Sequence, residues 1–186
     1  GHLYEVSPDG RERSRISNTT ILNIFDAIWS FDAGKAVLRI VRDGEVNNFS
    51  ASFGSTTQGV FLSKNIKFIA PAPTENKIAY LEEVGGKGIV FTADFENKNK
   101  RQIFSAPISE FLLFWQATEN LSLLTRPSAT EKGHLYALNI KNKNLEKLYE
   151  GTGLNILWSK SGKEFFISEG SGGNVQNAVF SVKDNK

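Results

Sequence analysis

AIWSFDAGKAVLRI (Ala27–Ile40) contains an apolar segment that ends in tryptophan, a polar turn and a second apolar segment. Three further segments repeat this order: FIAPAPTENKIAYL from Phe68, LFWQATENLSLLTR from Leu113 and ILWSKSGKEFFISE from Ile156. The positions equivalent to Trp29 are Ala70, Trp115 and Trp158, at intervals of 41, 45 and 43 residues. All three tryptophans therefore occupy one position of a repeat, and self-similarity at a fixed period indicates a repeat architecture.

A second marker has the same period. GHLY occurs at Gly1–Tyr4 and again at Gly133–Tyr136, and these two copies contain both histidines of the chain. The aromatic residue of this marker recurs as Tyr4, Phe49, Phe91, Tyr136 and Phe180, at intervals of 45, 42, 45 and 44 residues. His2 and His134 hold equivalent repeat positions. This predicts two surface residues in different sectors of the molecule and not a shared metal site.

Each period predicts four short strands. In HLYALNI (His134–Ile140) the side chains alternate between two faces, and outer segments such as KRQIFSA (Lys100–Ala106) carry charge. No window shows a helical stripe, and Val, Ile, Phe and Tyr dominate the apolar positions. Four strands in a period of this length are typical of a β-propeller blade. The sequence therefore predicts an all-β fold made of β-propeller blades, each a sheet of four antiparallel strands.

The strand count predicts an arc of blades within one domain, residues 1–186. The chain begins with the third and fourth strands of one blade, continues through three complete blades and ends with three strands of another. This is about four blades' worth of a propeller that we expect to have about six to eight blades. Closure as a four-bladed ring, or by self-association, is the alternative. The expected repeats are 1–20, 21–64, 65–106, 107–150 and 151–186.

Composition excludes several classes of function. Hydrophobic residues make up 40% of the 186 residues and charged residues 23%, as in globular domains. The net charge of +2 is too small to predict nucleic-acid binding. No apolar run approaches the roughly 18 residues of a membrane span, so no membrane insertion is predicted within these residues. Methionine is absent, which predicts that Gly1 is not the natural start, and without cysteine thiol catalysis is excluded.

No arrangement of residues predicts catalysis. The G-x-S-x-G motif is absent, and GSGG (Gly170–Gly173) lacks the lysine and the spacing of a phosphate-binding loop, so it is interpreted as a plain loop. Two histidines without a third ligand do not make a zinc site. We therefore expect no enzyme activity, no cofactor and no bound metal. The tryptophans are interpreted as residues that pack between blades.

WSFDAGK (Trp29–Lys35) and WSKSGK (Trp158–Lys163), each followed by an apolar strand, resemble degenerate copies of the W-S-P-D-G-K repeat. This repeat marks TolB-type, WD-like propellers, and related blades occur in prolyl oligopeptidase-type peptidases. The resemblance covers essentially the whole chain. It implies a propeller that serves as a binding platform, often in an extracytoplasmic bacterial setting, and we expect that location here.

The binding surface is predicted on one rim of the propeller, where the loops between blades and the loops between second and third strands lie together. The candidate residues are Asn18, Arg42, Asp43, Glu45, Glu82, Glu83, Lys87, Arg126, Glu131 and Glu169. The leading hypothesis is a non-catalytic scaffold that binds a protein or peptide partner through this rim. The alternatives are the propeller cap of a prolyl oligopeptidase-type serine peptidase, with its catalytic domain outside this chain, and a carbohydrate-binding propeller. The rim loops contain no aromatic residue, which disfavours carbohydrate binding.

Overall fold

The computed structural model describes residues 2–17, 20–53, 57–128, 130–159 and 161–182, and in these residues all regular structure is β-strand. The first hairpin and the first complete sheet are β1 (Tyr4–Val6), β2 (Arg13–Arg15), β3 (Ile24–Trp29), β4 (Lys35–Arg42), β5 (Glu45–Ser52) and β6 (Gln58–Phe61). The second complete sheet is β7 (Ile66–Pro71), β8 (Lys77–Val84), β9 (Lys87–Asp94) and β10 (Arg101–Ala106). The remaining strands are β11 (Phe111–Ala117), β12 (Asn120–Thr125), β13 (Lys132–Asn139), β14 (Leu145–Thr152), β15 (Asn155–Trp158), β16 (Glu164–Ser171) and β17 (Asn174–Ser181).

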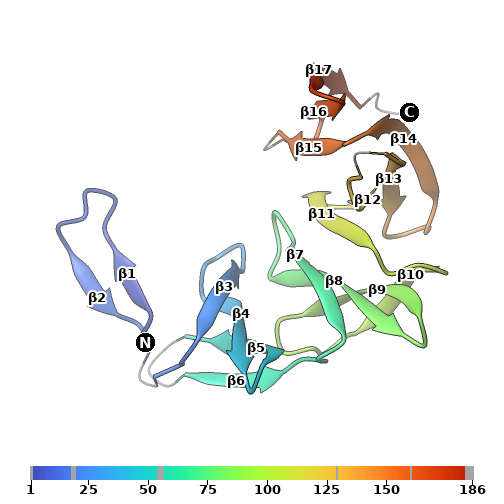
Figure 1. The fold of residues 1–186 in the computed structure, drawn as a ribbon. Helices are drawn as coiled ribbons and strands as arrows, with labels where there is room; N and C mark the ends of the chain where they lie inside the picture. The colour runs from blue at the N-terminus through green and yellow to red at the C-terminus, as the bar shows by residue number, and fades with distance from the viewer. Residues whose placement is uncertain (1, 18–19, 54–56, 129, 160, 183–186) are drawn as a thin grey trace.

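The described strands form one two-stranded hairpin, three four-stranded sheets and one three-stranded sheet, in chain order. Within each sheet, consecutive strands pair antiparallel. Figure 1 shows the sheets side by side around an open arc, and β7 contacts both β3 and β11, the first strands of the adjacent sheets. The predicted all-β fold of four-stranded propeller blades is confirmed, and the described sheets do not close into a ring.

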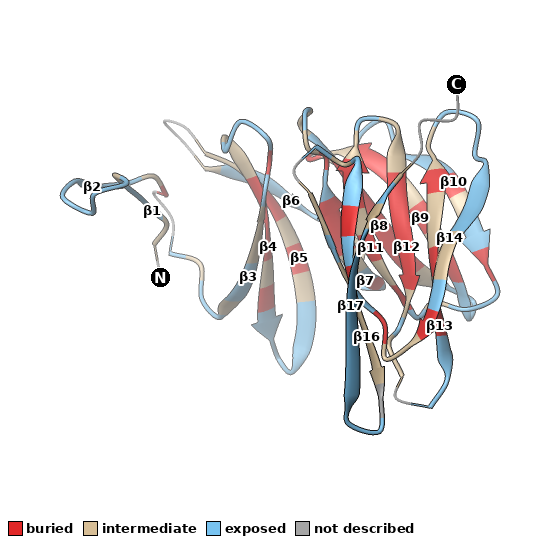
Figure 2. Cartoon of the chain, turned by 90° about the horizontal axis from the view of Figure 1, so that it is seen from above, coloured by how far each residue is buried: buried red, intermediate tan, exposed pale blue. Residues whose placement is uncertain are grey.

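The core lies between the sheets because the middle strands are apolar on both faces. In β8, Ile78 and Tyr80 belong to a buried cluster with Val37 of the preceding sheet. The intervening residues, Ala79 and Leu81, belong to another buried cluster, which is shared with the following sheet. Side chains alternate along a strand, so a continuous apolar run serves two interfaces at once. Figure 2 shows the buried residues concentrated in the middle of the arc, whereas β1, β2 and β17 are exposed.

The turn between the first and second strands of a sheet is built from short polar side chains. Asp32 Oδ1 accepts hydrogen bonds from Ser30 Oγ at 2.8 Å and from the Gly34 amide at 2.9 Å. Asp32 Oδ2 accepts a third bond, at 2.6 Å, from Nδ2 of Asn76 in the next sheet. Asp32 and Asn76 are 44 residues apart, so equivalent turns of neighbouring blades are linked directly.

Acid should weaken this turn. The donors Gly34, Ser30 and Asn76 lower the pKa of Asp32 from 3.8 to about 2. A carboxylate with a depressed pKa stabilises the fold above its unfolded pKa, and that stability is lost as the pH falls toward 2. We expect the free energy of unfolding, measured by urea denaturation, to fall from pH 5 to pH 2 less steeply in Asp32→Asn than in the wild type. Asp43→Asn, which removes the same charge from an exposed turn, is the control. Equal slopes in Asp32→Asn and the wild type would contradict this prediction.

Candidate rim and axial sites

Tight turns define the rim predicted to bind a partner. Asp43 and Gly44 join β4 to β5, and both have positive φ angles, 54° and 77°. Gly85 and Gly86 join β8 to β9 in the same way, with φ angles of 59° and 77°. Positive φ at both central residues is the geometry of a two-residue type I′ turn, which lets the flanking strands pair up to the turn. The rim loops are therefore shorter than expected, and four candidates predicted in these loops lie at strand ends instead: Arg42, Glu45, Glu83 and Lys87.

Two oppositely charged pairs lie beside the β4–β5 turn. Glu45 Oε2 is 2.6 Å from Nζ of Lys64, which belongs to the connection between the first and second four-stranded sheets. The hydrogen bond and charge of Lys64 lower the pKa of Glu45. Arg42 Nε lies 3.7 Å from Oδ2 of Asp43, and both side chains are strongly exposed. This part of the rim therefore presents both signs of charge.

A cleft opens on the same rim between the second and third four-stranded sheets. It has a volume of about 260 Å³. Its lining residues combine charged and apolar side chains: Lys67, Phe68, Ser109, Glu110, Phe111, Leu112 and Arg126. We call it the rim cleft. Arg126 NH1 donates to Glu110 Oε2 at 2.9 Å, and both residues lie on the side of the cleft formed by the third four-stranded sheet.

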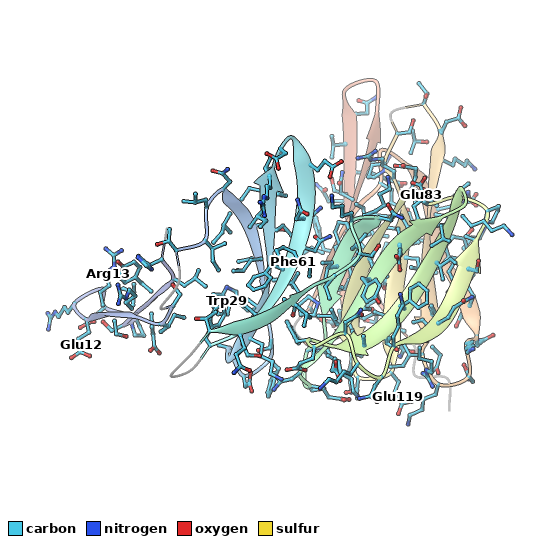
Figure 3. The ribbon with its side chains drawn as sticks, turned by 90° about the horizontal axis from the view of Figure 1, so that it is seen from below. Glu12, Arg13, Trp29, Phe61, Glu83 and Glu119 are labelled. Carbon is cyan, nitrogen blue, oxygen red and sulfur yellow. The ribbon has the colours of Figure 1, made fainter. Side chains whose placement is uncertain are left out.

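Glu83 binds two of the residues that line the rim cleft. Its Oε2 lies 2.9 Å from Lys67 Nζ and accepts a hydrogen bond from Ser109 Oγ at 3.1 Å. These two partners, Lys67 first, lower the pKa of Glu83. Figure 3 shows Glu83 on this rim and Glu119 on the opposite one. The structure thus brings two predicted residues, Glu83 and Arg126, to one cleft.

Backbone hydrogen bonds hold the connecting segments at the rim cleft in place. The Gly88 amide donates to the Ile108 carbonyl at 3.1 Å, and the Arg126 amide donates to the Glu110 carbonyl at 3.0 Å. A Cβ on Gly88 would lie 2.4 Å from the same Ile108 oxygen, so a residue without a side chain is needed there. The charged residues of the cleft are therefore presented on a fixed frame.

The other predicted site residues do not reach the rim cleft. Glu82 lies within β8 and is only 8% exposed, because alternation turns it onto a blade face, where Lys100 Nζ approaches to 3.0 Å. Glu169 lies within β16 and accepts a hydrogen bond from the Tyr149 hydroxyl at 3.0 Å. Lys87 and Glu131 are exposed at other points of the chain. Asn18 lies outside the described residues. The prediction that Glu82 and Glu169 are loop residues is wrong.

Sequence reasoning missed Lys67 as a site residue because it lies inside the first strand of a sheet, where apolar packing was expected. Ser109 and Glu110 lie in a connection between two blades, and such connections were expected on the rim. Their position in this connection is the sequence feature that could have identified them as site residues. Their side-chain partners, Glu83 and Arg126, come from the ends of β8 and β12. No local pattern pairs these residues.

A second cavity, of about 600 Å³, lies along the inner side of the arc. We call it the axial cavity. Its lining residues come from the first strands of four sheets and the segments that follow them: Trp29, Phe31, Phe68, Ile69, Ala70, Pro71, Ala72, Pro73, Leu113, Phe114, Trp115, Gln116, Ile156, Leu157 and Trp158. None of these described lining residues is charged. All three tryptophans line it, so the repeat position identified from the sequence faces the inside of the arc.

The histidines do not share a site. His2 Nε2 lies 3.2 Å from Thr20 Oγ1, whereas His134 Nδ1 lies 3.6 Å from Glu150 Oε2 in the third four-stranded sheet. In the part of the chain that the structure describes, no three His, Asp or Glu side chains are grouped to hold a metal ion. The same residues include no helix that could span a membrane.

Neither a family model nor a curated protein matches the sequence. Solved structures do resemble the fold. TolB from Acinetobacter baumannii matches with a TM-score of 0.66 at 11% identity, over 97% of this chain and 46% of TolB. Oligogalacturonate lyase from Vibrio parahaemolyticus matches with a TM-score of 0.70 at 10% identity, over 96% of this chain and 55% of the lyase.

The β-propeller domain of the Trilobed protease from Pyrococcus furiosus is also similar. Its TM-score is 0.59 at 14% identity, over 78% of this chain and 48% of that domain. The chain therefore spans about half the length of each of these solved structures. At such low identity the similarity shows a TolB-type β-propeller fold and does not show a function.

Proposed function

We propose that this chain is a non-catalytic β-propeller scaffold that binds a protein or peptide partner through its rim loops. The rim cleft is the observation that carries the proposal. It combines two ion pairs, Lys67–Glu83 and Arg126–Glu110, with apolar residues between two packed sheets. Binding residues are often placed on loops that a rigid scaffold positions.

The charged side chains of these ion pairs can separate at little cost and pair with charged groups of a partner instead. Arg126 and Glu110 are both more than half exposed. Exposed pairs contribute about 0–1 kcal/mol, so opening them costs little. A peptide that carries both an acidic and a basic side chain could take over both halves of such a pair. The apolar floor at Phe68 and Leu112 would receive a hydrophobic residue between those charges.

A rim variant tests the proposal. Peptides selected from a random library for binding to the wild-type chain should bind Arg42→Ala/Glu83→Ala/Arg126→Ala at least about tenfold more weakly, a loss of about 1.4 kcal/mol. The readout is the Kd by fluorescence anisotropy. The matched control, Lys77→Ala/Glu119→Ala/Lys141→Ala, removes the same charges from the opposite rim. Selected peptides whose binding falls with the control triple and not with the rim triple would contradict the proposal.

A peptidase propeller is the second candidate, favoured by the similarity to the propeller domain of the Trilobed protease. In that case the rim loops would face a hydrolase domain outside these residues. A G-x-S-x-G motif on a strand–turn–helix pattern in the same reading frame, together with hydrolysis of a peptide substrate by that longer protein, would favour this candidate. An extracytoplasmic location stays a prediction for both candidates.

A further inference from the structure

A further cleft, of about 490 Å³, lies between the second and third four-stranded sheets, at the rim opposite the rim cleft. We call it the opposite-rim cleft, and Glu119, labelled in Figure 3, is one of its lining residues. Both sheets that form it have all four strands. Its walls combine charged, hydroxyl and amide side chains with the apolar residues Trp115 and Ile140. Its volume is within the range of about 300–1,000 Å³ that is usual for small-molecule sites.

A buried hydroxyl group without a partner lies in this cleft. Thr92 lines the cleft, is only 9% exposed and lies opposite Ala79 on the face of the second sheet that packs against the third. The neighbouring pair on this face, Leu81 and Val90, is apolar and buried. Among the described residues, the Thr92 hydroxyl makes no hydrogen bond. Burying a hydroxyl without a partner is costly, so a ligand that accepts its hydrogen bond would remove that cost.

The cleft also contains two charges that are not neutralised by a neighbour. Four of its charged side chains form two ion pairs with one another: Lys77–Glu75, at 2.5 Å, and Lys141–Glu119. The other charged side chains of the lining are Arg101 and Asp94, and neither forms an ion pair with any described residue. One cation and one anion are therefore left for a ligand.

Strand register places these two charges and the Thr92 hydroxyl on one face of the second sheet. Arg101 of β10 lies directly opposite Thr92 of β9, so their Cβ atoms are about 4.5–5.5 Å apart. Asp94 lies two residues further along β9, on the same face and about 7 Å from Thr92. Hydrogen bonds hold both charged groups in place, because Arg101 donates to the Ile140 carbonyl and Asp94 accepts from the Lys98 amide at 2.6 Å.

We propose that the opposite-rim cleft binds a zwitterion, a free α-amino acid with an apolar side chain. The guanidinium fork of Arg101 and the hydroxyl of Thr92 donate hydrogen bonds to its carboxylate. Its ammonium group pairs with Asp94, and its side chain lies against Trp115 and Ile140. A simple anion or a simple cation would leave one of the two charges of the cleft unpaired. The site is independent of the proposed rim function, which uses the other rim.

Isothermal titration calorimetry of the wild-type chain gives the first test. At least one of leucine, methionine, phenylalanine and tryptophan should bind. Its analogue without the ammonium group and its analogue without the carboxylate should each bind at least about tenfold more weakly. For phenylalanine these analogues are phenylpropanoate and phenethylamine. If none of these amino acids bound, or if either analogue bound as tightly as its amino acid, the proposal would be overturned.

Two charge variants assign the partners of the zwitterion. Arg101→Gln should abolish the preference for the amino acid over the analogue without a carboxylate. Asp94→Asn retains an oxygen that can accept from the Lys98 amide, and it should abolish the preference over the analogue without an ammonium group. Arg11→Gln, the same substitution at a strongly exposed arginine of the first hairpin, should leave every Kd unchanged. Charge variants that weaken the amino acid and both analogues equally would overturn the assignment.

Thr92→Val separates ligand binding from folding. Valine has the shape of threonine without the hydroxyl, so the melting temperature of the free protein should not fall, whereas the Kd of the amino acid should rise about tenfold. Ser122→Ala is the matched control, because the Ser122 hydroxyl is also buried and makes no hydrogen bond among the described residues. It should leave the Kd unchanged, since Ser122 does not line the cleft. A Thr92→Val protein that binds the amino acid as tightly as the wild type would contradict the proposed role of Thr92.

Discussion

Replacing Trp115 with alanine is expected to lower the free energy of unfolding by about 3–5 kcal/mol. Trp115 is 7% exposed and belongs to the buried cluster between the second and third four-stranded sheets. Its indole Nε1 makes no hydrogen bond among the described residues, so the loss is one of packing. The side chain also lines both the axial cavity and a cleft of about 490 Å³ at the opposite rim. Truncation would join these two spaces and admit water to the blade interface.

Urea denaturation of the wild type, Trp115→Ala and Trp29→Ala measures this effect. Trp29 occupies the equivalent repeat position and is 36% exposed, so its truncation should cost less, about two thirds as much by buried area. Thermal unfolding should follow the same order, at roughly 2–4 °C per kcal/mol for a chain of this size. A loss below about 1 kcal/mol for Trp115→Ala would show that the residue does not fill the interface.

Gly162→Ala is expected to have the next largest effect, a loss of about 3 kcal/mol. Gly162 has a φ angle of +68°, which costs a residue with a side chain about 1–2 kcal/mol. A Cβ at this position would lie 2.3 Å from the carbonyl oxygen of Gln116 in the neighbouring sheet. Backbone cannot yield as a flexible side chain can, so the two sheets would have to separate, which costs about 1–3 kcal/mol more.

Gly172→Ala is the matched control for this prediction. Gly172 has a φ angle of +60°, and a Cβ there would meet nothing within 4 Å. Its substitution should cost the backbone strain alone, about 1–2 kcal/mol. The difference between the two free energies of unfolding, measured in urea, isolates the close approach of the third four-stranded sheet and the C-terminal sheet. If both variants lost the same stability, that close approach would not exist in solution.

The blades and their turns could be predicted from the sequence because both depend on neighbours in the chain. Period-two alternation places Ile78 and Ala79 on opposite faces of β8, and a run of apolar residues therefore marks a strand covered on both sides. SFDAGK (Ser30–Lys35) specifies its turn through Asp32, whose donors Ser30 and Gly34 are two residues away. The number of repeats in the sequence then predicts the number of four-stranded blades.

The site depended on the tertiary structure because its residues come from different repeats. Glu82 and Glu83 are adjacent and chemically alike, yet alternation buries Glu82 against Lys100 while Glu83 reaches Lys67 and Ser109 at the rim. Both lysines belong to the same sheet as the two carboxylates, so strand pairing within that sheet decides which lysine each one meets, and Ser109 adds a contact from the connection to the next sheet. The sequence by itself determined the strands, the turns and the blade repeat through local periodicity. Only the stacking of the sheets decided the rim cleft and the axial cavity, because each is lined by residues from strands of different sheets.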